Sequence, residues 1–289
     1  MNAGEKALTS CGRRHVFLWL IVIAIPAAAQ SNPSATQCSS PEVILQHYVT
    51  ALGGEAAIQG IQTSEIETEE TRPATFKPTS LDHNRWKFKW KAPNKVQVKQ
   101  MSPPFGITIM PRLPSSTFMF DGQAWSNYRG RVSHNEDRVP PLRRSLRAKY
   151  PYNDYPQNMM NRVVADPLMI ARSGDLYSSF TADSDFTASP GYCILHATGP
   201  DEFGYRRLDT LYFDAESGLL KSWRIQARSR LQANFSEQSD FFKFQFDDYR
   251  QVDAVKIPFS IYFSFYKANF HFTKVRFNQQ LPDAEFTPR

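Results

Sequence analysis

The chain has 289 residues and a formal net charge of +6 at pH 7, spread along its whole length. No recognised nucleic-acid-binding motif accompanies this basic balance, which argues against a DNA or other nucleic-acid partner. The sequence shows no internal repeat and no interior low-complexity linker, so its length allows one large β domain or two small ones.

The first 29 residues have the layout of a secretory signal peptide. Basic residues between Lys6 and Arg14 precede the uncharged apolar run Val16 to Ile25, and small residues ending at Ala29 mark the expected cleavage site. An uncleaved membrane anchor is the alternative, but the run is shorter than the ~20 apolar residues that span a bilayer. We therefore predict an exported, periplasmic protein in which residues 30–40 form a flexible lead-in.

The chain contains three cysteines, of which Cys11 would leave with the signal peptide. In an oxidising exported compartment, Cys38 and Cys193 could form a disulfide that ties the N-terminal segment to a strand. Either thiol could also stay free, because the sequence does not give their separation. Cys38 lies well past the apolar run, which argues against lipidation. No Cys-x-x-Cys-His run is present, and this excludes covalently attached c-type haem.

The first predicted element is a helix from Pro41 to Leu52. Ser40 supplies a hydroxyl N-cap, and proline suits the first helical turn. The pair Gly53-Gly54 ends the helix, since glycine tolerates the left-handed conformation that follows a helix end. A short second helical turn is expected from Glu55 to Gly60.

Strands follow, marked by alternation of apolar and polar side chains. The tryptophans and phenylalanine at positions 86, 88 and 90 share one face, opposite three lysines. The pair Asp121-Gly122 between apolar runs is a strong hairpin signal. The predicted strands are Ser64–Thr71, Arg85–Lys91, Val96–Gln100, Thr117–Phe120, Ala124–Tyr128, Gly191–Ala197, Arg206–Phe213 and Leu219–Arg228.

A helical insertion is predicted at about residues 140–180. It contains two patches of helical pattern, Leu142 to Ala148 and Pro167 to Leu176. Pro151 and Pro156 are interpreted as breaks between them, because proline disrupts a helix interior.

The aromatic–polar alternation is strongest from Phe242 to Phe277. Apolar residues at 242, 244 and 246 share one face, and those at 259, 261, 263 and 265 repeat the pattern. This indicates an antiparallel sheet with one apolar and one wet face. We predict an α+β fold, mainly antiparallel β: a strongly curved sheet or half-open β-barrel with helices covering its concave face.

Six segments carry a family resemblance. They are ALGG (51–54), KAPNKV (91–96), MFDGQAW (119–125), LYFDAESGLLKSW (211–223), FDDYRQVDAVKIPF (246–259) and VRFNQQLPDAEF (275–286). In this order, after a signal peptide, they resemble the bacterial LolA-like superfamily, which includes the periplasmic lipoprotein carrier and the outer-membrane lipoprotein receptor. The resemblance implies a single domain over 41–289, in which helices form a lid over an apolar cavity for acyl chains.

The apolar face of the predicted strands supplies the candidate lining of that cavity. A lipid tail gains ~0.8 kcal/mol for each methylene it buries, and aromatic walls provide area at low entropy cost. The candidates are Trp86, Phe88, Trp90, Phe118, Phe120, Leu211, Phe213, Trp223, Ile225, Phe259, Ile261, Phe263 and Phe265. Each of them alone would suit an ordinary core, so the prediction concerns the group.

Motifs for catalysis are lacking in the sequence. The six histidines form no metal-spaced pair, and there is no G-x-S-x-G elbow and no P-loop, so we expect neither an enzyme nor a metal or cofactor. The acidic groups Glu67–Glu70 and Asp247-Asp248 are interpreted as solvated strand edges.

The functional prediction is a periplasmic binding or carrier protein for a lipid or a lipoprotein acyl chain, similar to proteins of outer-membrane lipoprotein sorting. Its partners would be a lipid or acylated protein and an envelope membrane surface or membrane protein. One alternative is an envelope protein–protein interaction module with a filled core. Another is an envelope hydrolase, which would need a polar cleft with perturbed titratable groups.

Overall fold

The computed structural model describes residues 38–73, 81–101, 117–120, 125–127, 156–172, 177–183, 189–199, 205–229 and 241–287. All of them belong to one compact unit that begins at Pro33. The predicted signal peptide, most of the predicted lead-in, the Asp121-Gly122 turn and the helical patch Leu142 to Ala148 lie outside the described residues.

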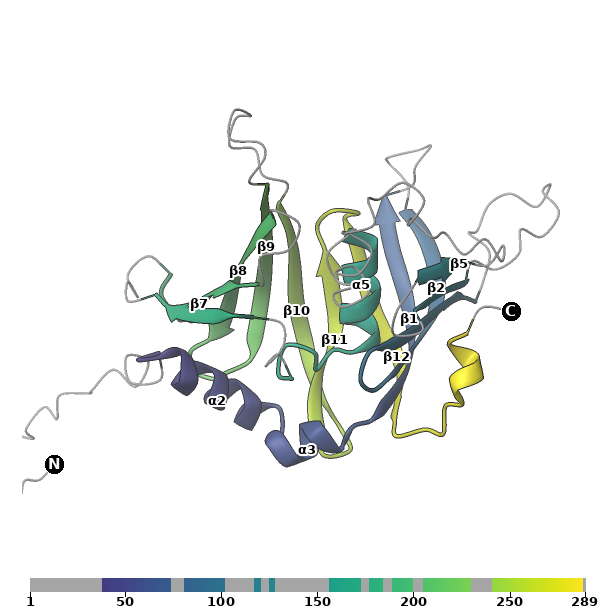
Figure 1. The fold of residues 1–289 in the computed structure, drawn as a ribbon, viewed down its shortest axis with the longest axis horizontal. Helices are drawn as coiled ribbons and strands as arrows, with labels where there is room; N and C mark the ends of the chain where they lie inside the picture. Colours follow the sequence, from purple (N-terminus) through teal and green to yellow (C-terminus); the bar gives the residue numbers. More distant parts are fainter. Residues whose placement is uncertain are drawn as a thin grey trace, which may run out of the picture. The chain divides into compact units, whose positions relative to one another are not determined.

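Antiparallel strands dominate the described residues (Figure 1). The strands are β1 (Thr63–Pro73), β2 (Leu81–Lys91), β3 (Lys95–Gln100), β4 (Thr117–Phe120), β5 (Trp125–Asn127), β6 (Ser179–Ala182), β7 (Tyr192–Thr198), β8 (Tyr205–Asp214), β9 (Leu220–Ser229), β10 (Phe241–Val252), β11 (Val255–Phe263) and β12 (Ala268–Phe277). The helices are α2 (Pro41–Ala51), α3 (Glu55–Gly60), α5 (Pro156–Ala165) and the 3-10 helix η4 (Asp283–Glu285).

The strands form a single sheet in the order β5-β4-β3-β2-β1-β12-β11-β10-β9-β8-β7-β6. The last strand of the chain therefore pairs with the first, from Ser64 opposite Phe277 to Thr71 opposite Asn269. The two edges, β5 and β6, do not pair with each other in the described part of the chain, so the sheet is not closed. This confirms the predicted mainly antiparallel, unclosed sheet, whereas the covering of its concave face by helices stays a prediction.

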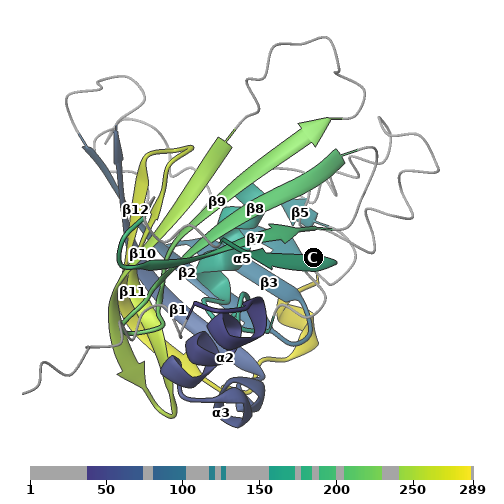
Figure 2. The ribbon, with the colours of Figure 1, turned by 90° about the vertical axis from the view of Figure 1, so that its left-hand side faces the viewer.

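The helix α2 begins and ends where the sequence predicts. The Ser40 hydroxyl accepts a hydrogen bond from the Val43 N–H, and Pro41 is the first helical residue. Gly53 has φ +118 and passes so close to the Ala254 carbonyl that a side chain would collide with it. Figures 1 and 2 show α2 and α3 together at one end of the strands.

A disulfide joins the start of this region to the sheet. Cys38 and Cys193 are bonded, with their Cα atoms 5.1 Å apart, so the segment that precedes α2 is tied to β7. Both cysteines are buried.

The helix of the insertion lies elsewhere than predicted. The structure has α5 at Pro156–Ala165, whereas the described part of the predicted Pro167–Leu176 patch forms turns. Pro156 is the first residue of α5, a position that favours proline, and does not act as a breaker. The insertion also contains β6, which the sequence analysis did not predict and which pairs with β7.

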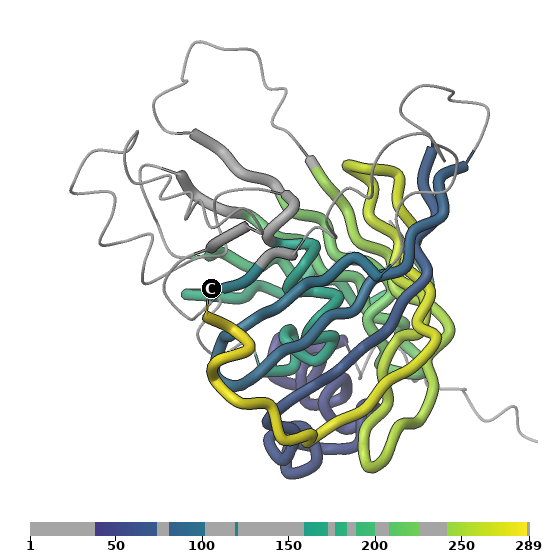
Figure 3. Tube along the Cα trace, turned by 90° about the vertical axis from the view of Figure 1, so that its right-hand side faces the viewer, coloured from purple at the N-terminus to yellow at the C-terminus, as the bar shows by residue number. Residues whose placement is uncertain are grey.

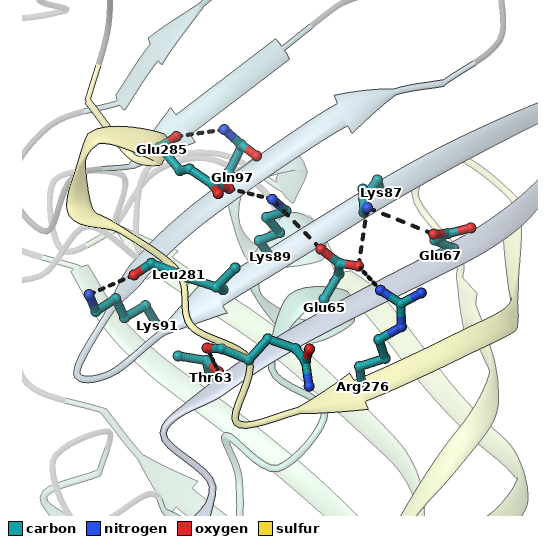
Figure 4. A network of polar contacts seen from close by, with 11 residues as sticks. Thr63, Glu65, Glu67, Lys87, Lys89, Lys91, Gln97, Arg276, Leu281 and Glu285 are labelled. Carbon is teal, nitrogen blue, oxygen red and sulfur yellow. Dashed lines mark hydrogen bonds and ion pairs between the residues drawn. The ribbon is translucent and has the colours of Figure 1, made fainter.

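The C-terminal segment, residues 278–287, forms a strap across β1, β2 and β3 (Figure 3). Polar contacts fasten it, and Figure 4 shows part of this network. Asp283 lies 2.7 Å from the Lys91 ammonium and 2.9 Å from that of Lys95, and Glu285 pairs with Lys89. The ammonium groups of Lys91 and Lys95 lower the pKa of Asp283 to about 2.

The same network continues onto the strands through Glu65. Its carboxylate lies 3.1 Å from both the Lys87 ammonium and the Arg276 guanidinium. Burial acts to raise the pKa of Glu65, but the neighbouring cations, chiefly Lys87, hold it below its ordinary value. One continuous set of charges therefore joins β1, β2, β12 and the strap.

Candidate apolar binding interior

Aromatic side chains from three neighbouring strands meet on the inner face of the sheet. Phe244 on β10 pairs in register with Trp223 on β9 and with Phe263 on β11. Its ring centroid lies 5.5 Å from that of Trp223 and 4.7 Å from that of Phe263. All three are fully buried, as expected for cross-strand neighbours on an apolar face.

Three further rings extend this group toward solvent. Phe242 lies 5.6 Å from Phe263, and Tyr266 lies 5.6 Å from Phe263 and 5.0 Å from Phe265. Phe242 and Tyr266 are half-buried, whereas Phe265 is 52% exposed. We call these six residues the aromatic cluster: Trp223, Phe242, Phe244, Phe263, Phe265 and Tyr266.

The turn after β11 corrects one part of the predicted pattern. The sequence analysis extended the strand through Phe265, but β11 ends at Phe263 and residues 264–267 form a turn. Lys267 has φ 51 and donates its N–H to the Ser264 carbonyl, so the two-residue alternation stops there. As a result Phe265 and Tyr266 are both in the cluster, although alternation alone would place them on opposite faces.

The other half of the inner face is occupied by α5, which packs against β1, β2 and β3. Met159, Met160, Val163 and Val164 of this helix are buried in the same core as the strands. These four residues occupy positions i, i+1, i+4 and i+5, which lie on one side of a helix, as expected for an amphipathic helix.

Three of the candidate lining residues are in the core of that half. Phe88, Trp90 and Phe120 are almost fully buried. The Arg172 guanidinium lies 4.5 Å from the Trp90 ring centroid, and that of Arg162 lies 5.5 Å from the Phe120 ring centroid. Protein groups therefore already cover two of these three rings.

The remaining candidates are distributed over the whole inner face. Leu211, Ile225 and Ile261 are buried. Phe213 is covered by α2, with its ring centroid 5.0 Å from that of Tyr48. Phe259 is half-buried beneath the Arg250 guanidinium, 4.6 Å from its ring centroid. The Phe118 side chain lies outside the described side chains; its backbone pairs with Val98 in β3.

Two buried carboxylates orient the inner tryptophans. Asp209 accepts hydrogen bonds of 2.8 Å from the Trp223 indole N–H and the Tyr177 hydroxyl. Glu70 accepts one of 2.6 Å from the Trp86 indole and one of 3.0 Å from the Asn84 amide. Indole donors usually find such partners when buried, and each bond fixes the plane of its ring.

Glu70 corrects an expectation, because the sequence analysis assigned it to a solvated strand edge. It is 3% exposed, because it lies on the inner face of a central strand, where the side chains of Asn84 and Trp86 donate to its carboxylate. Glu69, the next residue, is exposed on the other face. Sequence reasoning also missed Asp209, Phe242, Phe244 and Tyr266 as members of the site; only the two phenylalanines had a signal, their place in the alternating run.

A salt bridge inside the structure fixes the end of α5. Arg172 is hydrogen-bonded to Asp166 at 2.5 Å, and its guanidinium also donates to the carbonyls of Ile58 and Ile61 at 3.3 Å. Burial raises the pKa of Asp166 despite this pairing. These contacts join the residues after α5 to the link between α3 and β1.

No group of three or more His, Cys, Asp or Glu side chains within the described residues is placed to hold a metal ion. Across the same residues, none of the helices has the length and apolar character needed to cross a membrane.

Comparisons with known proteins find similar solved structures at low sequence identity. No protein-family model matches the chain, and no curated protein matches its sequence. A LolA superfamily protein from Nitrosomonas europaea is similar in structure, with 12% identity and a TM-score of 0.49, over 86% of this chain and 97% of that chain. A domain from Vibrio parahaemolyticus named for outer membrane lipoprotein sorting has 11% identity and a TM-score of 0.38, over 78% and 89%.

A LolA superfamily protein is thus among the solved structures that are similar to this chain at low sequence identity.

Proposed function

We propose that this chain binds the acyl chain of a lipid or lipoprotein on its aromatic cluster and carries it through the periplasm. The observation that supports the proposal best is the continuity of the cluster. Its rings form an unbroken series of contacts from the exposed Phe265 through Tyr266 to the buried Phe263, Phe244 and Trp223. The half-buried Phe242 lies beside this series, against Phe263 and Phe244. An apolar chain that first contacts Phe265 would therefore meet the half-buried rings of Tyr266 and Phe242 next, and the fully buried rings lie beneath these.

The energetics of such binding are favourable. Each buried methylene contributes ~0.8 kcal/mol, so about ten methylenes would supply roughly 8 kcal/mol before the costs of association. Aromatic rings have only two side-chain torsions to fix, and the indole of Trp223 is already held by Asp209. The side chains of the cluster would therefore lose little conformational entropy when a ligand binds.

The helices supply the remaining parts of the proposal. In it, α2 and α5 cover the concave face, α5 closing the side of β1 to β3 and α2 acting as the lid beside β6 and β7. Lipoprotein sorting, the task in the name of the Vibrio parahaemolyticus domain, is one form that such carriage would take. The proposal assigns the chain no catalytic step, and it requires a lipid or an acylated protein as partner.

Native mass spectrometry of the protein purified from an envelope fraction tests the proposal. We expect a discrete adduct that organic extraction resolves into a phospholipid or an acylated peptide. After delipidation, a fluorescent acyl probe should bind, and Phe265→Ala should weaken its binding about fivefold, because one large apolar contact is lost.

Leu81→Ala is the matched control, since Leu81 is also exposed, at 59%, but belongs to the start of β2 and not to the cluster. Its probe affinity should match that of the unmodified protein. A clean mass without adduct, together with no probe binding after delipidation, would show that the cluster is only core. An envelope protein–protein interaction module with a filled core would then be the better functional assignment.

A further inference from the structure

The face of the sheet opposite the aromatic cluster carries a second candidate site. A groove of about 1160 Å³ lies there, lined by side chains from β7 to β12. Gln245 lies between Phe244 and Phe246 in β10, and Tyr262 lies between Ile261 and Phe263 in β11, so both point away from the apolar interior. We propose that this groove binds an anionic glycan, a chain of sugar rings that carries carboxylate or sulfate groups.

The floor of the groove is a row of side chains in register across five strands. Tyr212, Ser222, Gln245, Tyr262 and Asn269 follow one another as direct cross-strand neighbours from β8 to β12. Strands lie ~4.8 Å apart, so the row is roughly 19 Å long. It offers hydroxyl and amide groups between two phenol rings, each with an apolar face and a polar tip. A linear ligand with many hydroxyls fits this row better than a compact or apolar one.

The charge of the groove selects for an anion. Lys221, Arg224 and Lys243 line it, against the single carboxylate of Asp247, which lies 3.5 Å from the Lys221 ammonium. Arg224 and Lys243 are direct cross-strand neighbours. An anion bound beside both would contact two cationic groups at once.

Ser222 gives an independent indication of a ligand. This residue lines the groove and is only 9% exposed, and its Oγ has no hydrogen-bond partner in the part of the chain that the structure describes. A buried hydroxyl without a partner is costly, and proteins usually satisfy it. The register of β9 shifts beside this residue, a bulge that brings both Lys221 and Ser222 to the groove.

This inference is separate from the proposed function, because it concerns the other face of the sheet and a ligand of opposite chemistry. The two can fail independently: loss of acyl-probe binding by Phe265→Ala leaves the groove intact, and changes in the groove leave the cluster intact.

Isothermal titration calorimetry of the purified protein tests the proposal with two probes, a galacturonate hexamer and a heparin hexasaccharide. We expect at least one to bind, with an affinity that falls as salt is added, since exposed charges are screened. Arg224→Ala and Lys243→Ala should each weaken binding about threefold, and Tyr262→Ala about fivefold. Lys274→Ala is the matched control, an exposed lysine of β12 outside the groove, and should change nothing.

Ser222→Ala separates binding from folding. It should weaken glycan binding about fivefold while leaving the free energy of unfolding unchanged or slightly raised, because it removes a hydroxyl without a partner. The methyl-esterified galacturonate hexamer, which keeps the rings and lacks the charge, should bind at least tenfold more weakly than the acid form if charge selects the ligand.

Three outcomes would overturn the proposal. The first is that neither probe binds at millimolar concentration. The second is that binding is equally strong in Arg224→Ala, Lys243→Ala and Ser222→Ala. The third is that neither probe binds while phosphatidylglycerol vesicles do, with the same dependence on Arg224 and Lys243, which would make the groove a membrane-docking surface.

Discussion

The two halves of the sheet are covered to different degrees. At β1 to β3, α5 packs against the inner face and the C-terminal strap crosses the strands with its charged contacts. At β8 to β12, the aromatic cluster reaches solvent at Phe265 on one face and the polar groove lies on the other. One continuous sheet thus combines a half with both faces covered and a half whose inner cluster reaches solvent at Phe265 and whose outer face carries the groove.

This division has a physical basis. Under the proposed function, the apolar surface that is exposed without ligand, at Phe265, contributes nothing to folding until a ligand covers it. The free energy of folding must then come from the rest of the domain. Here the buried core runs under both halves of the sheet, and the strap and the disulfide that ties the segment before α2 to β7 add to it.

The largest effect is expected from a substitution in the covered half. Phe88→Ala removes a fully buried ring whose centroid lies 6.1 Å from that of Phe270. We expect it to lower the free energy of unfolding by about 3–5 kcal/mol, measured by urea denaturation. Phe265→Ala, the same change in the open half, should lower it by less than about 0.5 kcal/mol. Equal losses in the two variants would show that the halves do not differ as described.

A smaller effect is expected from removing the disulfide. The Cys38→Ser, Cys193→Ser double variant releases a link between residues 155 positions apart in the chain, which constrains the unfolded state strongly. We expect a loss of about 2–4 kcal/mol in the free energy of unfolding. Because Cys38 lies three residues before the start of α2, hydrogen exchange in α2 should rise more than in α5. An equal rise in hydrogen exchange in both helices would contradict a local role for the disulfide.

The sequence predicted the strands well because their signal is local. Alternation of aromatic and polar residues depends on nothing beyond the strand itself, and β2, β8 and β9 begin and end within a few residues of the predicted bounds. The same holds for α2, whose cap and terminating glycines are contiguous in the chain.

Features that depend on residues distant in the chain could not be predicted from the sequence. Glu70 is buried because β12, two hundred residues later in the chain, pairs with β1. The helix α5 was misplaced because Pro156 suits a first turn as well as a break, and the choice depends on packing against β1 to β3. Tyr266 joins the cluster through a turn that alternation does not reveal.

Prediction of the candidate site met the same limit, because burial depends on residues distant in the chain. The sequence named Trp223, Phe263 and Phe265, which do lie together, but it gave Phe88 and Trp90 the same standing. Buried and exposed side chains on one face show the same alternation, because both point to the same side of the sheet. Phe88, Trp223 and Phe263 are all fully buried, and only Phe265 is exposed, in a turn that alternation does not reveal.

The smallest effect concerns the strap and its dependence on pH. Lys91 and Lys95 lower the pKa of Asp283 from an ordinary value of 3.8 to about 2. A carboxylate whose pKa is depressed by folding stabilises the folded state above its unfolded pKa, and this contribution is lost as the pH falls through the folded pKa. The strap should therefore hold above pH ~4 and loosen between pH ~4 and ~2.

Hydrogen exchange of residues 278–287, corrected for the intrinsic pH dependence, measures this loosening. Asp283→Asn should loosen the strap already at neutral pH, while exchange in β10 and β11 stays unchanged, because no contact of Asp283 reaches them. Asp253→Asn, in the turn between β10 and β11, is the matched control. Because Glu65 and Glu285 remain paired with Lys89, the variant should loosen the strap without releasing it. If protection of the strap did not change between pH 5 and pH 2, apolar burial of Phe286 and Leu281 would be holding it in place of the charges.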